Sequence, residues 1–534
     1  MHIRIKLLII VCNLLVSDTA SMLAQVWQSD LGNGDYKNPV IWADYSDPDV
    51  IRVGEDFYMT ASSFHCVPAL PILHSKDLVN WEIINYAVSR FPDTYFNVPQ
   101  HGNGVWAPSL RYHDGWFYIY WGDPDRGVFM VRTRNPRKDW SAPVLVKKAY
   151  GNIDPCPLWD DNGKVYLVHA FANSRAGLSH VLQLQELNAD GATVTKNRNI
   201  IISGLPENHT LEGPKFYKRN GWYYIFAPAG GVATGWQMVF RSKEIWGPYE
   251  GRKVLAQGNT NVNGPHQGGW MELESGQNWF MHFQELQPFG RIVHLQPVRW
   301  IDGWPVIGND QDGDGIGEPV AGFIKPATKA GYPARALQAS DEFNDRQYNL
   351  AWQWQANYYD HWYSLSERQG HLRLHAQYHD SPASLWMVPN ILAQKIPGPQ
   401  FIATTKIDAT NLANGEKAGL VNMGLDYASL TLSPSQDGFV LNLTVCKNAH
   451  QGYSEEIKQS IQVKSGGLFL RAIYTRNGTC QFAYSTDAQN YTKIGEAFAV
   501  REGRWIGAKI GLFALSSQVT GLKGYADFDW FRIE

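Results

Sequence analysis

The sequence predicts an all-β protein in which a five-bladed β-propeller precedes a β-sandwich. Three observations predict this fold class. Aromatic residues make up 13% of the 534 residues, 49 glycines and 28 prolines supply many turns, and a turn followed by an aromatic strand recurs along the first half of the chain. Aromatic residues favour strands, and Gly and Pro favour turns.

The first 24 residues have the pattern of a secretory signal peptide. Arg4 and Lys6 precede the apolar run 7–16, and Ala24 is a small residue suited to cleavage. The apolar run is too short to cross a bilayer, and no other segment is long and apolar enough to cross one. We therefore expect export to the periplasm or the extracellular space; a buried N-terminal strand is the alternative.

A repeated turn organises the next part of the chain. The Asn-Gly and Asp-Gly pairs in it are type I′ hairpin signals, because both central residues of such a turn need positive φ. Steps of 48 to 60 residues between repeats leave room for one four-stranded sheet in each. The five turns with their strands are 54–59, 114–119, 162–167, 220–225 and 275–280.

A proline precedes each turn in a nearly fixed phase. Pro is tolerated at the first residue of a strand and is expected to hold the preceding residue extended. The fixed phase favours a propeller over residues 29–305 rather than an ordinary sandwich with recurrent hairpins. The residues before the prolines should then surround one mouth of the central channel. The five dipeptides are Asp47-Pro48, Ala107-Pro108, Asp154-Pro155, Gly213-Pro214 and Gly264-Pro265.

Two further segments follow the propeller. Residues 306–337 are rich in Gly, Asp and Pro and are typical of a linker. Residues 310–315 resemble the start of an EF-hand loop, but Ala321 occupies the position of the bidentate Glu, which favours a solvated linker. Alternating strands predict a β-sandwich over 338–534. Cys446 and Cys480 could form a disulfide, and free buried thiols are the alternative.

Three acidic residues share the phase of the repeat. Asp47 and Asp154 stand directly before blade prolines, and Glu212 stands two residues before Pro214. Trp106 lies at the same place in the second blade. Each acid alone has a structural reading, as a turn or loop residue. Together they point to glycoside hydrolysis, which needs one carboxylic acid for the leaving oxygen and a carboxylate to activate water.

Several stretches together resemble glycoside hydrolase family 43, in the subgroup with a C-terminal concanavalin-like, jelly-roll sandwich. The resemblance covers nearly all of the chain after the signal peptide. The stretches are 38–40, 45–50, 73–81, 106–110, 153–155 and 211–214.

The resemblance implies a role for each acid. Asp47 would be the general base, Glu212 the general acid, and Asp154 the carboxylate that modulates the pKa of the acid and orients the sugar. The family inverts anomeric configuration, so the base and acid carboxyls should lie ~6.5–9.5 Å apart.

The resemblance also implies further site residues. Phe64 and Trp106 would lie against the sugar ring, and Arg291 would reach a sugar hydroxyl and steady Asp154. His266 would lie beside an axial calcium ion or a water cluster. The alternatives are inter-blade packing for the aromatics, an ion pair at a blade edge for Arg291, and a buried, hydrogen-bonded ring for His266. No cofactor is required for the reaction, and any calcium would be structural.

The function expected from these residues is exo-acting removal of terminal α-L-arabinofuranose from a plant cell-wall polysaccharide or oligosaccharide. A β-D-xylosidase, or both activities, is the alternative within the family, and a non-catalytic carbohydrate-binding propeller is the alternative from another class. A retaining fructan hydrolase would carry Asn-Asp-Pro-Asn and Glu-Cys where this chain has 46–49 and 212–213. The net charge of −3 disfavours nucleic acid as a partner. A monomer is expected.

Overall fold

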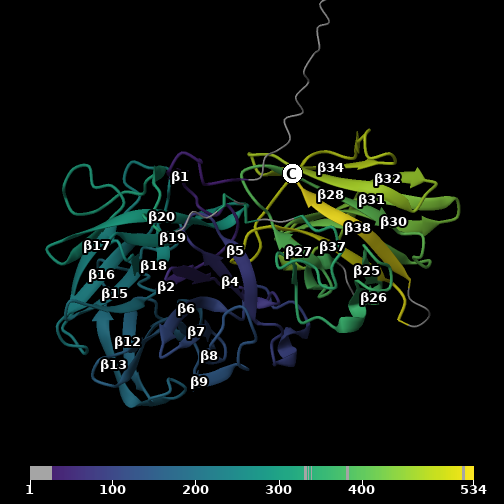
Figure 1. The fold of residues 1–534 in the computed structure, drawn as a ribbon. Helices are drawn as coiled ribbons and strands as arrows, with labels where there is room; N and C mark the ends of the chain where they lie inside the picture. Colours follow the sequence, from purple (N-terminus) through teal and green to yellow (C-terminus); the bar gives the residue numbers. More distant parts are fainter. Residues whose placement is uncertain (1–26, 330–332, 335, 338–339, 380–383, 520–523) are drawn as a thin grey trace, which may run out of the picture.

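A computed structural model describes residues 27–329, 333–334, 336–337, 340–379, 384–519 and 524–534. The expected signal peptide, 1–24, lies outside the described residues. Figure 1 shows two bodies side by side, a propeller in purple to teal and a sandwich in green to yellow. The predicted fold class is confirmed. The described helices are all short: η1 (Thr94–Asn97), α1 (Asn173–Ala176), η2 (Asp360–Trp362), η3 (Leu385–Met387) and η4 (Ala449–Gln451).

Each blade of the propeller is one antiparallel sheet of four consecutive strands. Local hairpins therefore build every blade, as the repeat predicts. The blades are β2 (Asp49–Val53), β3 (Asp56–Thr60), β4 (Ala69–Ser75), β5 (Glu82–Val88); β6 (Trp106–His113), β7 (Trp116–Asp123), β8 (Gly127–Thr133), β9 (Val144–Lys148); β10 (Asn152–Trp159), β11 (Val165–Phe171), β12 (Val181–Leu187), β13 (Val194–Ser203); β14 (Lys215–Arg219), β15 (Trp222–Ala229), β16 (Trp236–Ser242), β17 (Glu250–Leu255); and β18 (His266–Glu272), β19 (Asn278–Leu286), β20 (Gly290–Ile301), β21 (Trp304–Ile307).

The first strands of the blades lie next to one another around the axis. β2 packs against β6 and β6 against β10, while β18 of the last blade packs against β2 of the first and closes the ring. A backbone pairing between Ile41 and Val293 also joins the chain across the seam between these two blades. Near the seam, β1 (Asp35–Lys37) pairs with β22 (Gly322–Ile324) as a third connection.

The residues before the blade prolines are not extended, contrary to the sequence expectation. Positive φ turns the chain in a direction that an extended residue cannot take. For a non-glycine residue this conformation costs roughly 1–2 kcal/mol. Such strain concentrates at functional sites. The φ values are 54° at Asp47, 31° at Ala107, 56° at Asp154, 58° at Gly213 and 47° at Gly264.

Two of the predicted hairpin turns have the backbone that type I′ requires. Asp114 and Gly115 have φ of 47° and 77°, and Asn220 and Gly221 have 49° and 72°. In the third repeat only Gly163 has positive φ, and the amide of Gly163 donates to the carbonyl oxygen of residue 160 within a longer loop. The Asn-Gly pair there marks a turn but not a two-residue hairpin.

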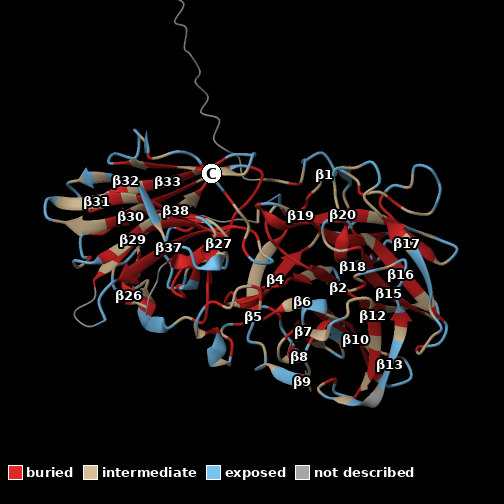
Figure 2. Cartoon of the chain, turned by 180° about the vertical axis from the view of Figure 1, so that it is seen from behind, coloured by how far each residue is buried: buried red, intermediate tan, exposed pale blue. Residues whose placement is uncertain are grey.

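Two large sheets form the sandwich. Figure 2 shows the buried residues in the interior of both bodies. One sheet orders its strands as β23-β27-β37-β29-β30-β31-β32 and the other as β24-β25-β38-β28-β33-β34-β35. Off these paths, β26 pairs with β37 and β36 pairs with β34. The strands are β23 (Gln353–Trp354), β24 (Tyr363–Ser364), β25 (Leu372–His375), β26 (Gln377–Tyr378), β27 (Leu392–Lys395), β28 (Phe401–Asp408), β29 (Glu416–Met423), β30 (Tyr427–Ser435), β31 (Gly438–Cys446), β32 (Glu456–Val463), β33 (Gly467–Tyr474), β34 (Thr479–Ser485), β35 (Thr492–Lys493), β36 (Phe498–Ala499), β37 (Lys509–Ser516) and β38 (Tyr525–Ile533).

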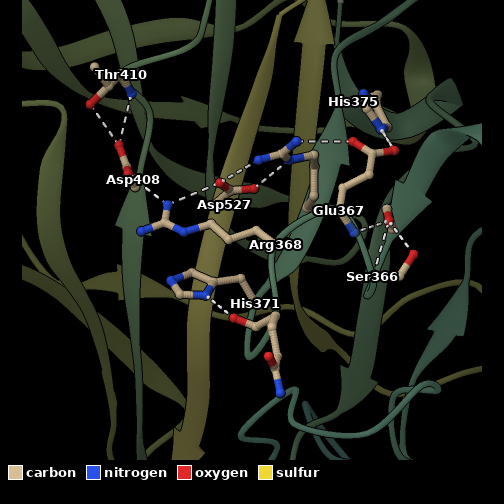
Figure 3. A network of polar contacts seen from close by, with 11 residues as sticks. Ser366, Glu367, Arg368, His371, His375, Asp408, Thr410 and Asp527 are labelled. Carbon is tan, nitrogen blue, oxygen red and sulfur yellow. Dashed lines mark hydrogen bonds and ion pairs between the residues drawn. The ribbon is translucent and has the colours of Figure 1, made fainter.

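A polar network ties three strands of the second sheet together (Figure 3). Asp527 is buried on β38 and accepts two hydrogen bonds from Arg373 of β25 at 2.8 and 3.0 Å. Arg368 joins Asp527 to Asp408 at the end of β28. Because both carboxylate oxygens of Asp527 have cationic partners, its buried charge is compensated.

The propeller and the sandwich share one apolar core. Val67 of the first blade pairs with Trp354 of the sandwich through the backbone, and both side chains are fully buried in the same cluster. The Nζ atom of Lys509 lies 3.0 Å from the Sγ atom of Cys66 across the same interface. Cys446 and Cys480 are free buried thiols, which settles the two alternatives left by the sequence.

Candidate active site

A pocket of about 290 Å³ opens at the mouth of the propeller where the residues before the prolines gather. It is at the small end of ligand pockets, which span ~300–1,000 Å³, and suits a single sugar ring. Six of the seven site residues expected from the sequence line it; His266 does not. The lining residues are Asp47, Phe64, Trp106, Ala107, Ile153, Asp154, Thr210, Glu212, Gly231, Val232, Gln267, Arg291 and Trp505.

Asp47 is a buried carboxylate whose neighbours all donate to it. The hydroxyls of Ser46 and Ser62 donate to Oδ2 at 2.8 and 2.5 Å, and Arg291 donates to Oδ1 at 3.1 Å. The Ser62 hydroxyl also accepts the amide of Ala107 at 2.8 Å, which fixes its direction. Three donors hold the Asp47 carboxylate in one orientation as an acceptor, the state that activation of water requires.

Asp154 and Glu212 face an environment that favours their protonated forms. Burial raises the pKa of Asp154, the amide of Gly213 opposes this with a 2.7 Å hydrogen bond, and the charge of Asp47 raises it further. Burial also raises the pKa of Glu212, and the charge of Asp154 adds to the effect. Like charges in a low-dielectric pocket cannot all ionise, so protons are retained at neutral pH.

The backbone brings these groups to the pocket in different ways. Asp154 lies in β10 at a bulge, where the pairing with β11 shifts between Ile153 and Cys156. Glu212 lies in the loop before β14, and its amide donates to the carbonyl oxygen of Pro228 at 3.1 Å. A bulge re-aims a side chain without ending the strand.

Arg291 binds a different acid from the one the sequence led us to expect. Its direct ion pair is with Asp47, and its Nε atom lies 3.6 Å from Glu285. No hydrogen bond joins Arg291 to Asp154 among the described residues. Arg291 lies on β20 in the last blade, so it steadies Asp47 of the first blade across the seam.

Phe64 and Trp106 form an aromatic wall of the pocket. Their ring centroids lie 6.2 Å apart at 62°. Phe64 is buried with φ of 51°, and its backbone pairs with Val105. Trp106 is the first residue of β6, and its indole N–H donates to the carbonyl oxygen of Gly102 at 2.8 Å. Both rings border the pocket, as expected for contact with a sugar.

His266 is fully buried beside Glu212, at 3.4 Å between Nε2 and Oε1. Its ring stacks on Phe283, and neither ring nitrogen has a hydrogen-bond partner among the described residues. Burial lowers its pKa to about 3, with Arg291 adding to the effect, so the ring is neutral. Calcium prefers six to eight oxygen ligands. Among the described residues, no group of three acidic or metal-ligating side chains includes His266, and an axial calcium ion or water cluster beside it stays a prediction.

The acidic loop of the linker is mostly exposed, and its three carboxylates lie close together. The ligand oxygens of Asp310, Asp312 and Asp314 all lie within 4.8 Å of one another, the sole such acidic or metal-ligating group of three within the described ranges. Amides of the loop donate to the same carboxylates, for example Gly313 to Asp310 at 2.8 Å. These hydrogen bonds account for the close approach of the three carboxylates, and none of the three lines the pocket.

Trp505 is one of the pocket residues that the sequence did not indicate, and it is the one that comes from the second domain. It belongs to the sandwich, has φ of 63°, and is 45% exposed. Its ring lies 6.3 Å from that of Trp106, and the guanidinium of Arg291 lies 5.8 Å from its centroid. Neither spacing nor motif marks Trp505, because only the docking of the second domain brings it to the first.

Comparison with known proteins agrees with this architecture. The family model for glycosyl hydrolases family 43 matches residues 36–305, and the model for the beta xylosidase C-terminal concanavalin A-like domain matches 340–534. A protein of Xylanibacter ruminicola, named as a candidate beta-xylosidase, is 40% identical over 90% of this chain and 86% of its own. A non-reducing end alpha-L-arabinofuranosidase of Bacteroides ovatus is 32% identical over 96% of this chain and 97% of its own.

Solved structures show the same two-domain arrangement. The GH43 protein BlXynB of Bacillus licheniformis superposes with a TM-score of 0.80 at 26% identity, covering 93% of this chain and 99% of that one. The catalytic alternative is thereby preferred over a carbohydrate-binding propeller. No described helix is long and apolar enough to cross a membrane. The chain is a glycoside hydrolase and belongs to glycosyl hydrolase family 43.

Proposed function

We propose that the protein is an exo-acting, inverting glycosidase that removes one terminal pentose from a plant cell-wall glycan. The observation that carries the proposal is the convergence of Asp47, Asp154 and Glu212, from three blades, on one small pocket. Asp47 is held as an acceptor and serves as general base. Glu212 retains its proton and serves as general acid, and Asp154 maintains the raised pKa of Glu212.

We place β-D-xylose ahead of α-L-arabinofuranose as the sugar released. Relatives named beta-xylosidase support this choice, including one from Formosa agariphila that is 31% identical over 95% of this chain. The Bacteroides ovatus arabinofuranosidase keeps arabinofuranose as the second candidate. Hydrolysis rates of nitrophenyl β-D-xyloside and nitrophenyl α-L-arabinofuranoside decide between them.

We also propose export through the segment 1–24.

Substitution of the acid and the base provides the test of the roles. Glu212→Gln should lower kcat/KM on xylo-oligosaccharides by ~10²–10⁴-fold, because their leaving oxygen needs a proton. Its effect on nitrophenyl glycosides should be smaller, since nitrophenolate leaves without one. Asp47→Asn should lower both rates to a similar extent, because water activation is common to both.

Asp161→Asn is the matched control, since Asp161 is an exposed acid outside the pocket. If Glu212→Gln lowers kcat/KM equally for both leaving groups, Glu212 is not the general acid. NMR of the first-formed sugar tests inversion: the released xylose should appear as the α-anomer, and a β-anomer would contradict the assignment of Asp47 as a base.

A further inference from the structure

A second cavity of about 220 Å³ lies beside the active-site pocket, at the junction of the two domains. The propeller contributes Asn103 and Arg175, the latter from the single turn α1. The sandwich contributes Trp386 from η3 and the consecutive residues Arg504 and Trp505 from one loop. The cavity therefore exists only when both domains are in place.

Two tryptophans separate this cavity from the sugar pocket. Trp505 lines both cavities. Trp106 lines the sugar pocket, and its indole N–H binds the carbonyl oxygen of Gly102, which lines the second cavity. The Arg175 guanidinium lies 5.8 Å from the Trp106 ring. The shared Trp505 makes the two cavities neighbours at the domain junction.

The second cavity carries positive charge. Arg175 is pinned by Asp125 at 3.0 Å and by the amide oxygen of Asn103 at 2.9 Å, so its charge is largely compensated. Arg504 is exposed and has no carboxylate partner within the described ranges. None of the residues that line the cavity is acidic. The guanidinium fork of Arg504 is free to bind a carboxylate in a bidentate manner.

We propose that the second cavity is the leaving-group site and that it selects a sugar bearing a carboxylate, a uronic acid. Arg504 binds the carboxylate, and the exposed ring of Trp505 supports the sugar face. This inference rests on the proposed hydrolysis and adds the chemical class of the leaving group. Arg504 is a specificity residue, because it acts on the part of the substrate that does not react.

The test compares two nitrophenyl xylosides that differ only in a ring carboxylate or the matched carboxamide on the leaving group. For the wild-type enzyme, kcat/KM should be ~10-fold higher for the carboxylate, through KM, and the preference should fall as NaCl is raised. Arg504→Gln should bring the ratio close to one, and Arg504→Lys should restore part of it. D-glucuronate should inhibit the wild type more strongly than D-glucose, and Arg504→Gln should abolish that difference.

Arg476→Gln is the matched control, because Arg476 is exposed in the sandwich, away from both cavities, and loses the same charge. It should keep the wild-type ratio. A ratio of one in the wild-type enzyme, or an unchanged ratio in Arg504→Gln, would overturn the inference while leaving the hydrolase assignment intact. Absence of cleavage of both xylosides and of the matching arabinofuranosides would overturn the proposed function as well.

Discussion

At the scale of single residues, the three pocket carboxyls are chemically alike but differ in what surrounds them. Asp47 receives two hydroxyls and a guanidinium, whereas Asp154 receives one amide and Glu212 lies against a neutral His266. The phase of the prolines predicted that these acids meet. It could not predict that Arg291 pairs with Asp47, because that choice depends on side-chain geometry across two blades.

The pH dependence of the reaction follows from this contrast. Glu212 acts while protonated, so the rate falls as pH rises through its pKa, which the pocket raises to about 8. Asp154→Asn removes a neighbouring negative charge, which favours ionised Glu212 and lowers its pKa. The alkaline limb of the kcat/KM profile should therefore move to lower pH.

Asp161→Asn should leave that limb in place, since its carboxylate is exposed to solvent. An alkaline limb that stays fixed or moves to higher pH in Asp154→Asn would show that Asp154 does not support the proton on Glu212.

At the scale of elements, five prolines and five turns were enough to predict five sheets, because each blade is built from neighbouring hairpins. The direction of the chain before each proline could not be predicted from proline sterics alone, which favour an extended residue. Tertiary contacts override that preference. At Ala107, for example, the amide is held by the Ser62 hydroxyl while φ is 31°.

Gly213 is one of the positions where this backbone course leaves no room for a side chain. A Cβ atom there would lie 2.6 Å from the Gln267 side chain, in addition to the strain of φ at 58°. Gly213→Ala should lower the free energy of unfolding by ~1–3 kcal/mol, measured by denaturant titration.

Gly163→Ala separates the effect of backbone strain from the effect of the Gln267 contact. Gly163 has φ of 79° and open space around a Cβ, so it should cost only the backbone strain, about 1 kcal/mol. Equal losses in the two variants would mean that the Gln267 contact is unimportant for stability.

At the scale of the whole molecule, the sandwich is part of the active site rather than an appendage. It shares a core with the first blade and supplies Trp505 to the pocket. Alternating strands predicted a second domain, but its docked position follows from the fit of two finished surfaces. For this reason Trp505 could not be identified from local patterns.

Trp505→Ala should lower kcat/KM on nitrophenyl β-D-xyloside by about 10-fold, because a ring that borders the pocket and lies near Arg291 is lost. The change should fall mainly on KM. Tyr453→Ala is the control, since Tyr453 is an exposed aromatic of the sandwich outside the pocket. Unchanged kinetics in Trp505→Ala would show that the sandwich does not take part in sugar binding.

The seam of the propeller has a consequence for protein synthesis. Asp47 leaves the ribosome early, but its guanidinium partner Arg291 follows 244 residues later. Until the last blade joins the first, the nascent chain carries an incompletely held base. Hydrolytic competence therefore requires that the circle of blades is sealed and that the sandwich has docked, and enzyme activity can report on this assembly during folding.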